Sequence, residues 1–202
     1  MADEDFRREQ WEHRFDPHIA PVNALVDRLS DPDGREWMPY VAPMHGGTNA
    51  TVLSLLRSPR PATQRRKGSG FLSVENDDRI AEQQWHLFHD AGIDLAVVLP
   101  WNAHPWYIDG APSAAELEAG VAALARLIAV APALQVAILQ GRVAKAAWRQ
   151  LLSRFPETAR GIKAVPTIRP GRKSLMQLSP AVRAEGAAAQ VEAFRLARQI
   201  LG

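Results

Sequence analysis

Short apolar runs alternate along this chain with segments that carry an apolar stripe at helical spacing. The apolar runs predict strands at residues 38–44, 93–99, 134–141 and 162–171. The striped segments predict helices at 17–29, at 79–91, after a cap at Ser113, at 142–155 and at 179–202, and a further helix that starts at 51–57. Apolar strands that alternate with helices are typical of a parallel sheet. The pattern predicts a single α/β domain over residues 1–202, with three layers (α/β/α) and a short, mainly parallel four-stranded sheet.

Several helix ends carry their own local signals. Asp16 and Pro17 suit the start of the first predicted helix. Ser113 with Glu116 three residues later matches a capping box. The acidic stretch ENDD, residues 75–78, offers Asn76, Asp77 or Asp78 as a cap for the helix that follows.

Four polar loops follow the predicted strands: HGGTN, WNAHPWY, QGR and TIRPGRK. In a doubly wound sheet, ligands bind beyond the carboxyl ends of the strands. We therefore expect these loops to meet at one edge of the sheet. Asn102 stands out because it ends an apolar strand and has aromatic neighbours. It is either a structural turn residue or a reader of a flat polar ligand.

Composition narrows the class of protein. The chain has 202 residues, 47% of them hydrophobic and 23% charged, which is ordinary for a globular protein. It has no cysteine, which excludes disulfides and cysteine-ligated zinc or iron–sulfur clusters. The charged N-terminus carries no apolar signal segment, and no run of about 18 apolar residues suggests a membrane span. We expect a soluble, cytoplasmic, monomeric protein that makes no membrane contact.

The net charge is only +2, but the bases are clustered. Residues 57–67 hold five bases and no acid, and residues 169–173 hold three. Two basic loops on one body favour contact with an anionic backbone, although two solvated loops explain the same pattern. The candidate phosphate contacts are Arg57, Arg60, Arg65, Arg66, Lys67, Arg172 and Lys173.

Familiar catalytic motifs are missing. HGGTN lacks the Gly-Lys-Ser/Thr of a Walker loop and the third glycine of a dinucleotide fingerprint. His45 and His104 are candidate hydrogen-bonding or acid–base groups, or simply structural histidines. His86 and His89 lie three residues apart without a third ligand, so no metal is expected.

In their order along the chain, the loops from Tyr40 onward resemble those of the uracil-DNA glycosylase superfamily. Gly47-Thr48-Asn49 resembles the motif that positions the hydrolytic water, and GSGFLSVEND resembles the stretch with an aromatic that stacks on uracil. VVLPWN resembles the strand that ends in a uracil-reading asparagine, and ILQGRVAKAAW resembles a further family stretch.

This resemblance implies a role for individual residues. Asn49 would orient the water, with Asp77 or Asp78 in reserve. Phe71 would stack on the base and Asn102 would pair with its O4 and N3–H, with His104 beside the base. Arg169 and the backbone N–H groups of Gly46 and Gly47 would stabilise the departing anion. Leu175 or Met176 would fill the gap in the DNA.

The chain also departs from the family pattern. Arg169-Pro170-Gly171 stands where the family usually has His-Pro-Ser, and the acid of the first motif is absent. The implied function is a metal-free, cofactor-free DNA repair glycosylase that removes uracil and leaves an abasic site. Two alternatives stay open: a superfamily member that binds uracil or abasic DNA with little turnover, and a nucleotide- or phosphosugar-binding enzyme on a flavodoxin-like sheet.

Overall fold

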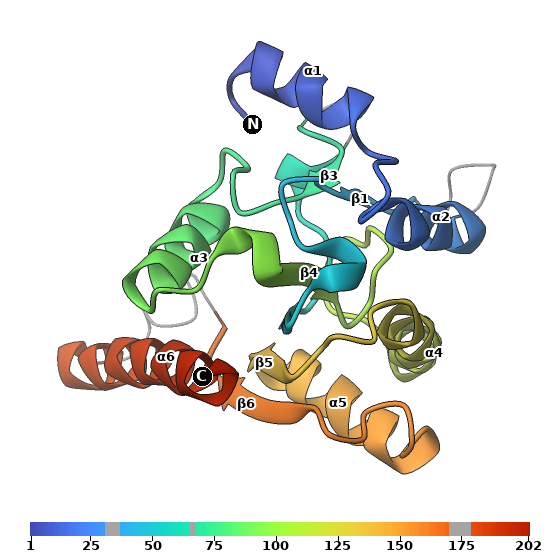
Figure 1. Ribbon diagram of the computed structural model, residues 1–202. Helices are drawn as coiled ribbons and strands as arrows, with labels where there is room; N and C mark the ends of the chain where they lie inside the picture. Colours follow the sequence, from blue (N-terminus) through green and yellow to red (C-terminus); the bar gives the residue numbers. More distant parts are fainter. Residues whose placement is uncertain (31–36, 65–67, 170–178) are drawn as a thin grey trace.

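A four-stranded parallel sheet forms the centre of the molecule in a computed structural model, which describes residues 1–30, 37–64, 68–169 and 179–202 (Figure 1). The strand order across the sheet is β4-β2-β5-β6. The strands are β2 (Val52–Leu56), β4 (Val98–Asn102), β5 (Val136–Gln140) and β6 (Lys163–Thr167). The predicted α/β class with a mainly parallel four-stranded sheet is confirmed.

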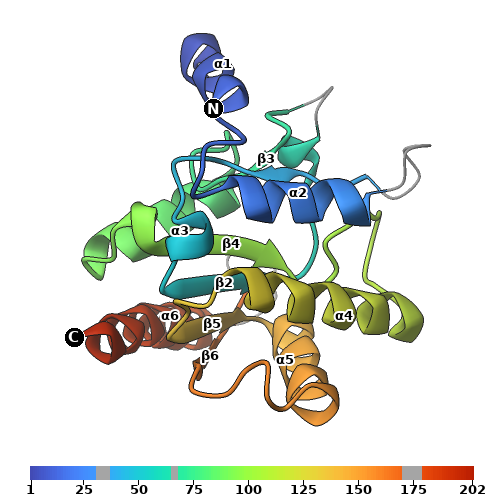
Figure 2. The same cartoon turned by 45° about the vertical axis from the view of Figure 1, so that its right-hand side comes forward.

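Helices cover both faces of this sheet (Figures 1 and 2). On one face, α3 (Arg79–Asp90) and α6 (Pro180–Leu201) bury Phe88 and Phe194 against the strands. On the other face lie α2 (Ala20–Leu29), α4 (Ala114–Val130) and α5 (Arg142–Arg154). In the described part of the chain, no helix is both long enough and apolar enough to cross a bilayer.

A second, smaller sheet lies beside the first and is joined to α2. It pairs β1 (Tyr40–Val41) with β3 (Phe71–Leu72) in parallel, and α1 (Glu4–Glu12) lies next to it (Figure 1). The buried Asn23 of α2 donates from Nδ2 to the Val41 carbonyl oxygen at 3.0 Å and accepts from the Val41 N–H at 2.9 Å. This asparagine therefore fixes β1 to the helix.

The prediction of a helix starting at 51–57 is wrong, because these residues contain β2. This strand pairs with β4 on one side and β5 on the other, and its first four residues are buried. A central strand covered on both faces, here apolar except for Ser54, shows no alternation, so periodicity does not separate it from a buried helix. Residues 38–44 supply only β1 of the small sheet. The main sheet has four strands as predicted, but β2 takes the place of the first one.

The local helix signals have mixed outcomes. The capping box of α4 is confirmed, since Ser113 N–H donates to Glu116 Oε2 at 2.7 Å and Ser113 Oγ accepts from Glu116 N–H at 3.3 Å. Asp78 is the cap of α3. The predicted start of α2 at Asp16 and Pro17 is wrong, because the helix begins at Ala20 without a side-chain cap.

Candidate ligand-binding site

The sheet face beneath α3 and α6 changes from apolar to polar along the strands. Near the amino ends of the strands this face is apolar, with one buried cluster that contains Val52, Val98, Val136, Ile138 and Val165. Side chains two positions further on share the same face. These later positions near the carboxyl ends are polar and buried: Ser54, Asn102, Gln140 and Thr167. Leu56 pairs with Asn102 and Gln140 pairs with Thr167, so the polar positions run across the sheet at its carboxyl edge.

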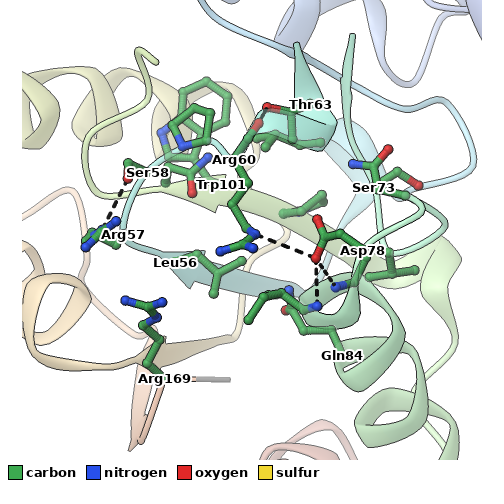
Figure 3. A pocket seen from close by; sticks show the side chains of 18 residues that line it. Leu56, Arg57, Ser58, Arg60, Thr63, Ser73, Asp78, Gln84, Trp101 and Arg169 are labelled. Atoms are coloured by element: carbon green, nitrogen blue, oxygen red, sulfur yellow. Dashed lines mark hydrogen bonds and ion pairs between the residues drawn. The ribbon is translucent and has the colours of Figure 1, made fainter. Parts of the chain in front are cut away.

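A pocket opens over this polar edge (Figure 3). Its cavity is small, with a volume of about 70 Å³, and it is partly open to solvent. Its walls come from the segment after β2, from the last residues of β4, from the stretch between β3 and α3, from the first two turns of α3, and from Arg169. The charged and amide side chains that line it are Arg57, Arg60, Asn76, Asp78, Gln84, Asn102 and Arg169.

Asn102 is the polar side chain in this pocket that most needs an explanation. It is 1% exposed, and its amide nitrogen Nδ2 is sealed from solvent without a hydrogen bond to a described residue. The backbone fixes the position of Asn102. Directly after it, Ala103 N–H donates to the Leu56 carbonyl at 2.8 Å and His104 N–H donates to the Arg57 carbonyl at 2.9 Å. A buried polar group without a partner costs about 1–3 kcal/mol. A cost of this kind at a pocket wall indicates a ligand-binding group.

Three guanidinium groups gather around the same pocket (Figure 3). Arg57 and Arg60 come from the loop after β2, and Arg169 follows β6. Burial lowers the pKa of Arg169, and the positive charges of Arg57 and Arg60 lower it further. Among the described residues that line the pocket, only Asp78 carries a carboxylate. The excess of positive charge favours a ligand with a negative group.

Asp78 has two structural duties already. Its Oδ1 accepts hydrogen bonds from the backbone N–H groups of Ile80 at 2.7 Å and Ala81 at 3.2 Å, which caps α3. The same oxygen lies 3.6 Å from Arg60 Nε. The side chain is 15% exposed, so its second oxygen, Oδ2, is the atom available to a ligand or a water.

A buried hydrogen-bond triangle supports the pocket from below. Gln84 Oε1 accepts from Ser54 Oγ and from Gln140 Nε2, and Gln140 Nε2 also donates to Ser54 Oγ, all at 2.8 Å. The three residues come from α3, β2 and β5. None of them was among the site residues expected from the sequence, and a glutamine inside a helix gives no sequence signal for such a role.

The structure brings several predicted site residues together and leaves others elsewhere. Arg57, Arg60, Asn102 and Arg169 share the pocket, and so does the reserve candidate Asp78.

Gly46, Gly47 and Asn49 lie at the opposite end of the sheet. Gly46 N–H donates to the carbonyl of Val98, the first residue of β4, while Asn102 is the last residue of that strand. At about 3.3 Å per residue, the two ends are roughly 13 Å apart. The prediction that HGGTN shares an edge with Asn102 is therefore wrong. Its cause is the assignment of β2 as a helix, since HGGTN precedes a strand of the main sheet, and the strand before it, β1, belongs to the small sheet.

Three further predicted residues do not line the pocket. Phe71 is fully buried behind its wall, with its ring centroid 4.8 Å from that of Trp11. His104 is buried with Nδ1 3.1 Å from the Glu116 carbonyl oxygen. Asp77 is exposed and lines a separate hollow beside Met1.

The remaining candidates are outside the described part of the chain. They are the predicted phosphate contacts Arg65, Arg66, Lys67, Arg172 and Lys173, and the predicted wedge residues Leu175 and Met176.

Comparison with known proteins gives no family for this chain. No protein-family model matches the sequence, and no curated protein matches it. The functional argument therefore depends on the pocket, where an unpartnered amide lies beside a cluster of arginines. That combination is suited to a planar, hydrogen-bonding ring that carries an anionic group.

Proposed function

We propose that this protein is a DNA glycosylase, which takes a flipped uracil into the pocket at the carboxyl edge of the sheet and hydrolyses its N-glycosidic bond to leave an abasic site. The observation that carries the proposal is the buried, unpartnered amide of Asn102 in a pocket surrounded by arginines. The resemblance of VVLPWN to the uracil-reading strand of the uracil-DNA glycosylase superfamily supports the same role.

Asn102 reads the base. A carboxamide offers one donor and one acceptor side by side, and the uracil edge offers O4 as acceptor and N3–H as donor. Because Asn102 is 1% exposed, a base that leaves its amide unpaired is disfavoured strongly. The same residue thus supplies both binding and discrimination.

The chemical step replaces the bond from the sugar C1′ to the base N1 by a bond from C1′ to a water oxygen. The electron pair of the broken bond leaves with uracil as an anion, and the proton that the water loses ends on this anion to give neutral uracil. Arg169 stabilises the negative charge on the departing base. Asp78 orients the water through Oδ2, the role first expected of Asn49. Arg57 and Arg60 contact the phosphates of the flipped strand, and binding therefore weakens with salt.

A second candidate function is binding of uracil or abasic DNA with little turnover. One observation favours it: Asp78, the carboxylate of the described pocket lining, is already engaged by two backbone N–H groups and by Arg60. These contacts give Oδ1 a structural role, which leaves only Oδ2 to act on a water.

The test is excision from end-labelled oligonucleotides with one uracil, single- and double-stranded, followed by alkali to cleave abasic sites. Oligonucleotides with thymine in place of uracil, paired with adenine or with guanine, serve as controls, and the Asn102→Leu variant is assayed beside the wild type. Cleavage of uracil strands by the wild type alone supports the glycosylase proposal. A salt-dependent shift on uracil or abasic DNA without cleavage supports the binding protein. Affinity for free nucleotides without DNA binding leaves a nucleotide-binding enzyme as the function.

A further inference from the structure

Gln84 lies in the pocket wall but belongs to none of the sequence motifs. It is on the second turn of α3, is 5% exposed, and lines the pocket together with Asn102 and Asp78 (Figure 3). It is thus a second buried amide facing the same space.

Its orientation is fixed by its oxygen. Gln84 Oε1 accepts two hydrogen bonds of 2.8 Å, one from Ser54 Oγ and one from Gln140 Nε2. Ser54 and Gln140 are both 1% exposed or less and are themselves bonded to each other at 2.8 Å. An amide whose oxygen is held at two points in the core cannot turn to present that oxygen to a ligand.

The nitrogen of the same amide has no such partner. Gln84 Nε2 forms no hydrogen bond with a described residue, and it is not among the described side-chain atoms that are sealed from solvent without a partner. The neighbouring Gln83, in contrast, donates from Nε2 to Gln190 Oε1 at 2.7 Å. Gln84 therefore offers two N–H donors to the pocket and no acceptor.

We infer that Gln84 is a specificity-determining residue of the proposed glycosylase, and that its Nε2 donates a hydrogen bond to the carbonyl oxygen of the base that Asn102 does not contact. This inference rests on the proposed function. Uracil has two carbonyl oxygens. Asn102 pairs with O4, and the Nε2 donor of Gln84 is suited to the other oxygen, O2. Ser54 and Gln140 are positioning residues, because they act on the base only by holding Gln84.

Gln84→Glu is the informative substitution. A carboxylate still accepts hydrogen bonds from Ser54 and Gln140, so the triangle keeps its form, but it presents an acceptor to the base where the glutamine presents a donor. Gln84→Met removes both the donor and the triangle. Gln83→Glu is the matched control, because it makes the same chemical change one residue earlier on α3 and outside the pocket.

We would measure kcat/KM for excision of uracil, 2-thiouracil and 4-thiouracil by the wild type and the three variants, with the Tm of each. Sulfur is a poor hydrogen-bond acceptor, so the wild type should discriminate against the thio-base whose sulfur replaces the oxygen bonded by Gln84. Gln84→Glu should lower kcat/KM on uracil by at least about tenfold, the equivalent of about 1.4 kcal/mol. In Gln84→Met the discrimination at that one position should disappear, while Gln83→Glu should keep it.

Wild-type rates and wild-type discrimination in Gln84→Glu and Gln84→Met would overturn the inference and leave the proposed function intact. Equal losses of rate in Gln84→Glu and Gln83→Glu, in step with Tm and with unchanged discrimination, would also overturn it, since they indicate a purely structural role. Failure of the wild type to excise uracil would reject the proposed function itself, and the inference with it.

Discussion

Gly141 lies directly against Arg169: a Cβ atom added to Gly141 would stand 2.9 Å from the Cβ atom of Arg169. Gly141 has a φ of +96° and is the residue from which α5 starts. Its N–H donates to the carbonyl of Thr167, the last residue of β6, at 3.0 Å. The glycine therefore sets the path by which the chain leaves β6 and carries Arg169 to the pocket.

We predict that Gly141→Ala weakens the function of Arg169 as well as the fold. The positive φ alone costs an alanine about 1–2 kcal/mol. The contact with Arg169 adds to this and moves the arginine away from the pocket. Gly161→Ala is the control, because Gly161 has a φ of +85° but nothing within 4 Å of an added Cβ. Urea unfolding should show a loss in both variants, and uracil excision should fall only in Gly141→Ala; equal excision by the two would contradict the role given to Gly141.

Asn102→Leu should abolish uracil excision without destabilising the protein. Leucine has a similar size and brings no polar atom, so the penalty of about 1–3 kcal/mol for the unpaired amide is relieved. Asn23→Leu provides the contrast, since Asn23 is equally buried but bonds to Arg14 and Val41. Thermal unfolding should give a Tm at or above the wild type for Asn102→Leu and a marked decrease for Asn23→Leu. A large loss of stability in Asn102→Leu would mean that the amide has a structural partner.

Replacement of Arg57 by glutamine should reduce the salt dependence of DNA binding. Each guanidinium that neutralises a phosphate of the DNA contributes close to one unit to the slope of log Kd against log salt concentration. Arg57→Gln should therefore lower the slope by about one unit, whereas Arg149→Gln, an exposed position in the middle of α5, should not change it. Fluorescence anisotropy of a labelled uracil oligonucleotide over a range of salt measures both slopes, and equal slopes for the two variants would remove Arg57 from the interface.

The alternation of apolar and striped segments predicts the α/β architecture because it reflects burial directly. The predicted ranges of α3, α5 and α6 match the structure within about two residues. Residues 51–57 fail for a physical reason: β2 is in the middle of the sheet and covered on both faces, so its residues are apolar except for the buried Ser54 and do not alternate. Because of that one error, HGGTN is expected at the carboxyl edge of the sheet but lies at the opposite edge. Gly46, Gly47 and Asn49 are misplaced with it.

The candidate site is predictable where a residue ends or closely follows a predicted strand, as Asn102 and Arg169 do, or belongs to a basic run, as Arg57 and Arg60 do. Gln84 meets neither condition. Glutamine is an ordinary helix residue, and its inward orientation depends on how α3 packs on β2 and β5. Whether Asp77 or Asp78 faces the pocket depends on the exact residue at which α3 begins, and the sequence does not fix that residue.

His45 should make the stability of the protein depend on pH. Its side chain is 1% exposed, and burial lowers its pKa from 6.5 to about 4, with a hydrogen bond to the Leu95 carbonyl acting weakly in the opposite direction. As pH falls through 6.5 the unfolded chain takes up a proton that the folded chain does not accept until about pH 4. The contribution of the neutral His45 to the free energy of unfolding is therefore fully present above pH 6.5 and decreases below it. By pH 4 the free energy of unfolding has fallen by about 3 kcal/mol because of this group.

Urea unfolding at pH 7.5 and pH 4.5 measures this effect. The carboxylates of the protein also respond to acid, so the comparison is between variants. His45→Gln should flatten the decrease between the two pH values, because glutamine does not titrate. His13→Gln, at a position whose side chain is 54% exposed, should leave the decrease as it is in the wild type. If His45→Gln and the wild type lost the same free energy on acidification, the buried imidazole would not be the group that limits stability in acid.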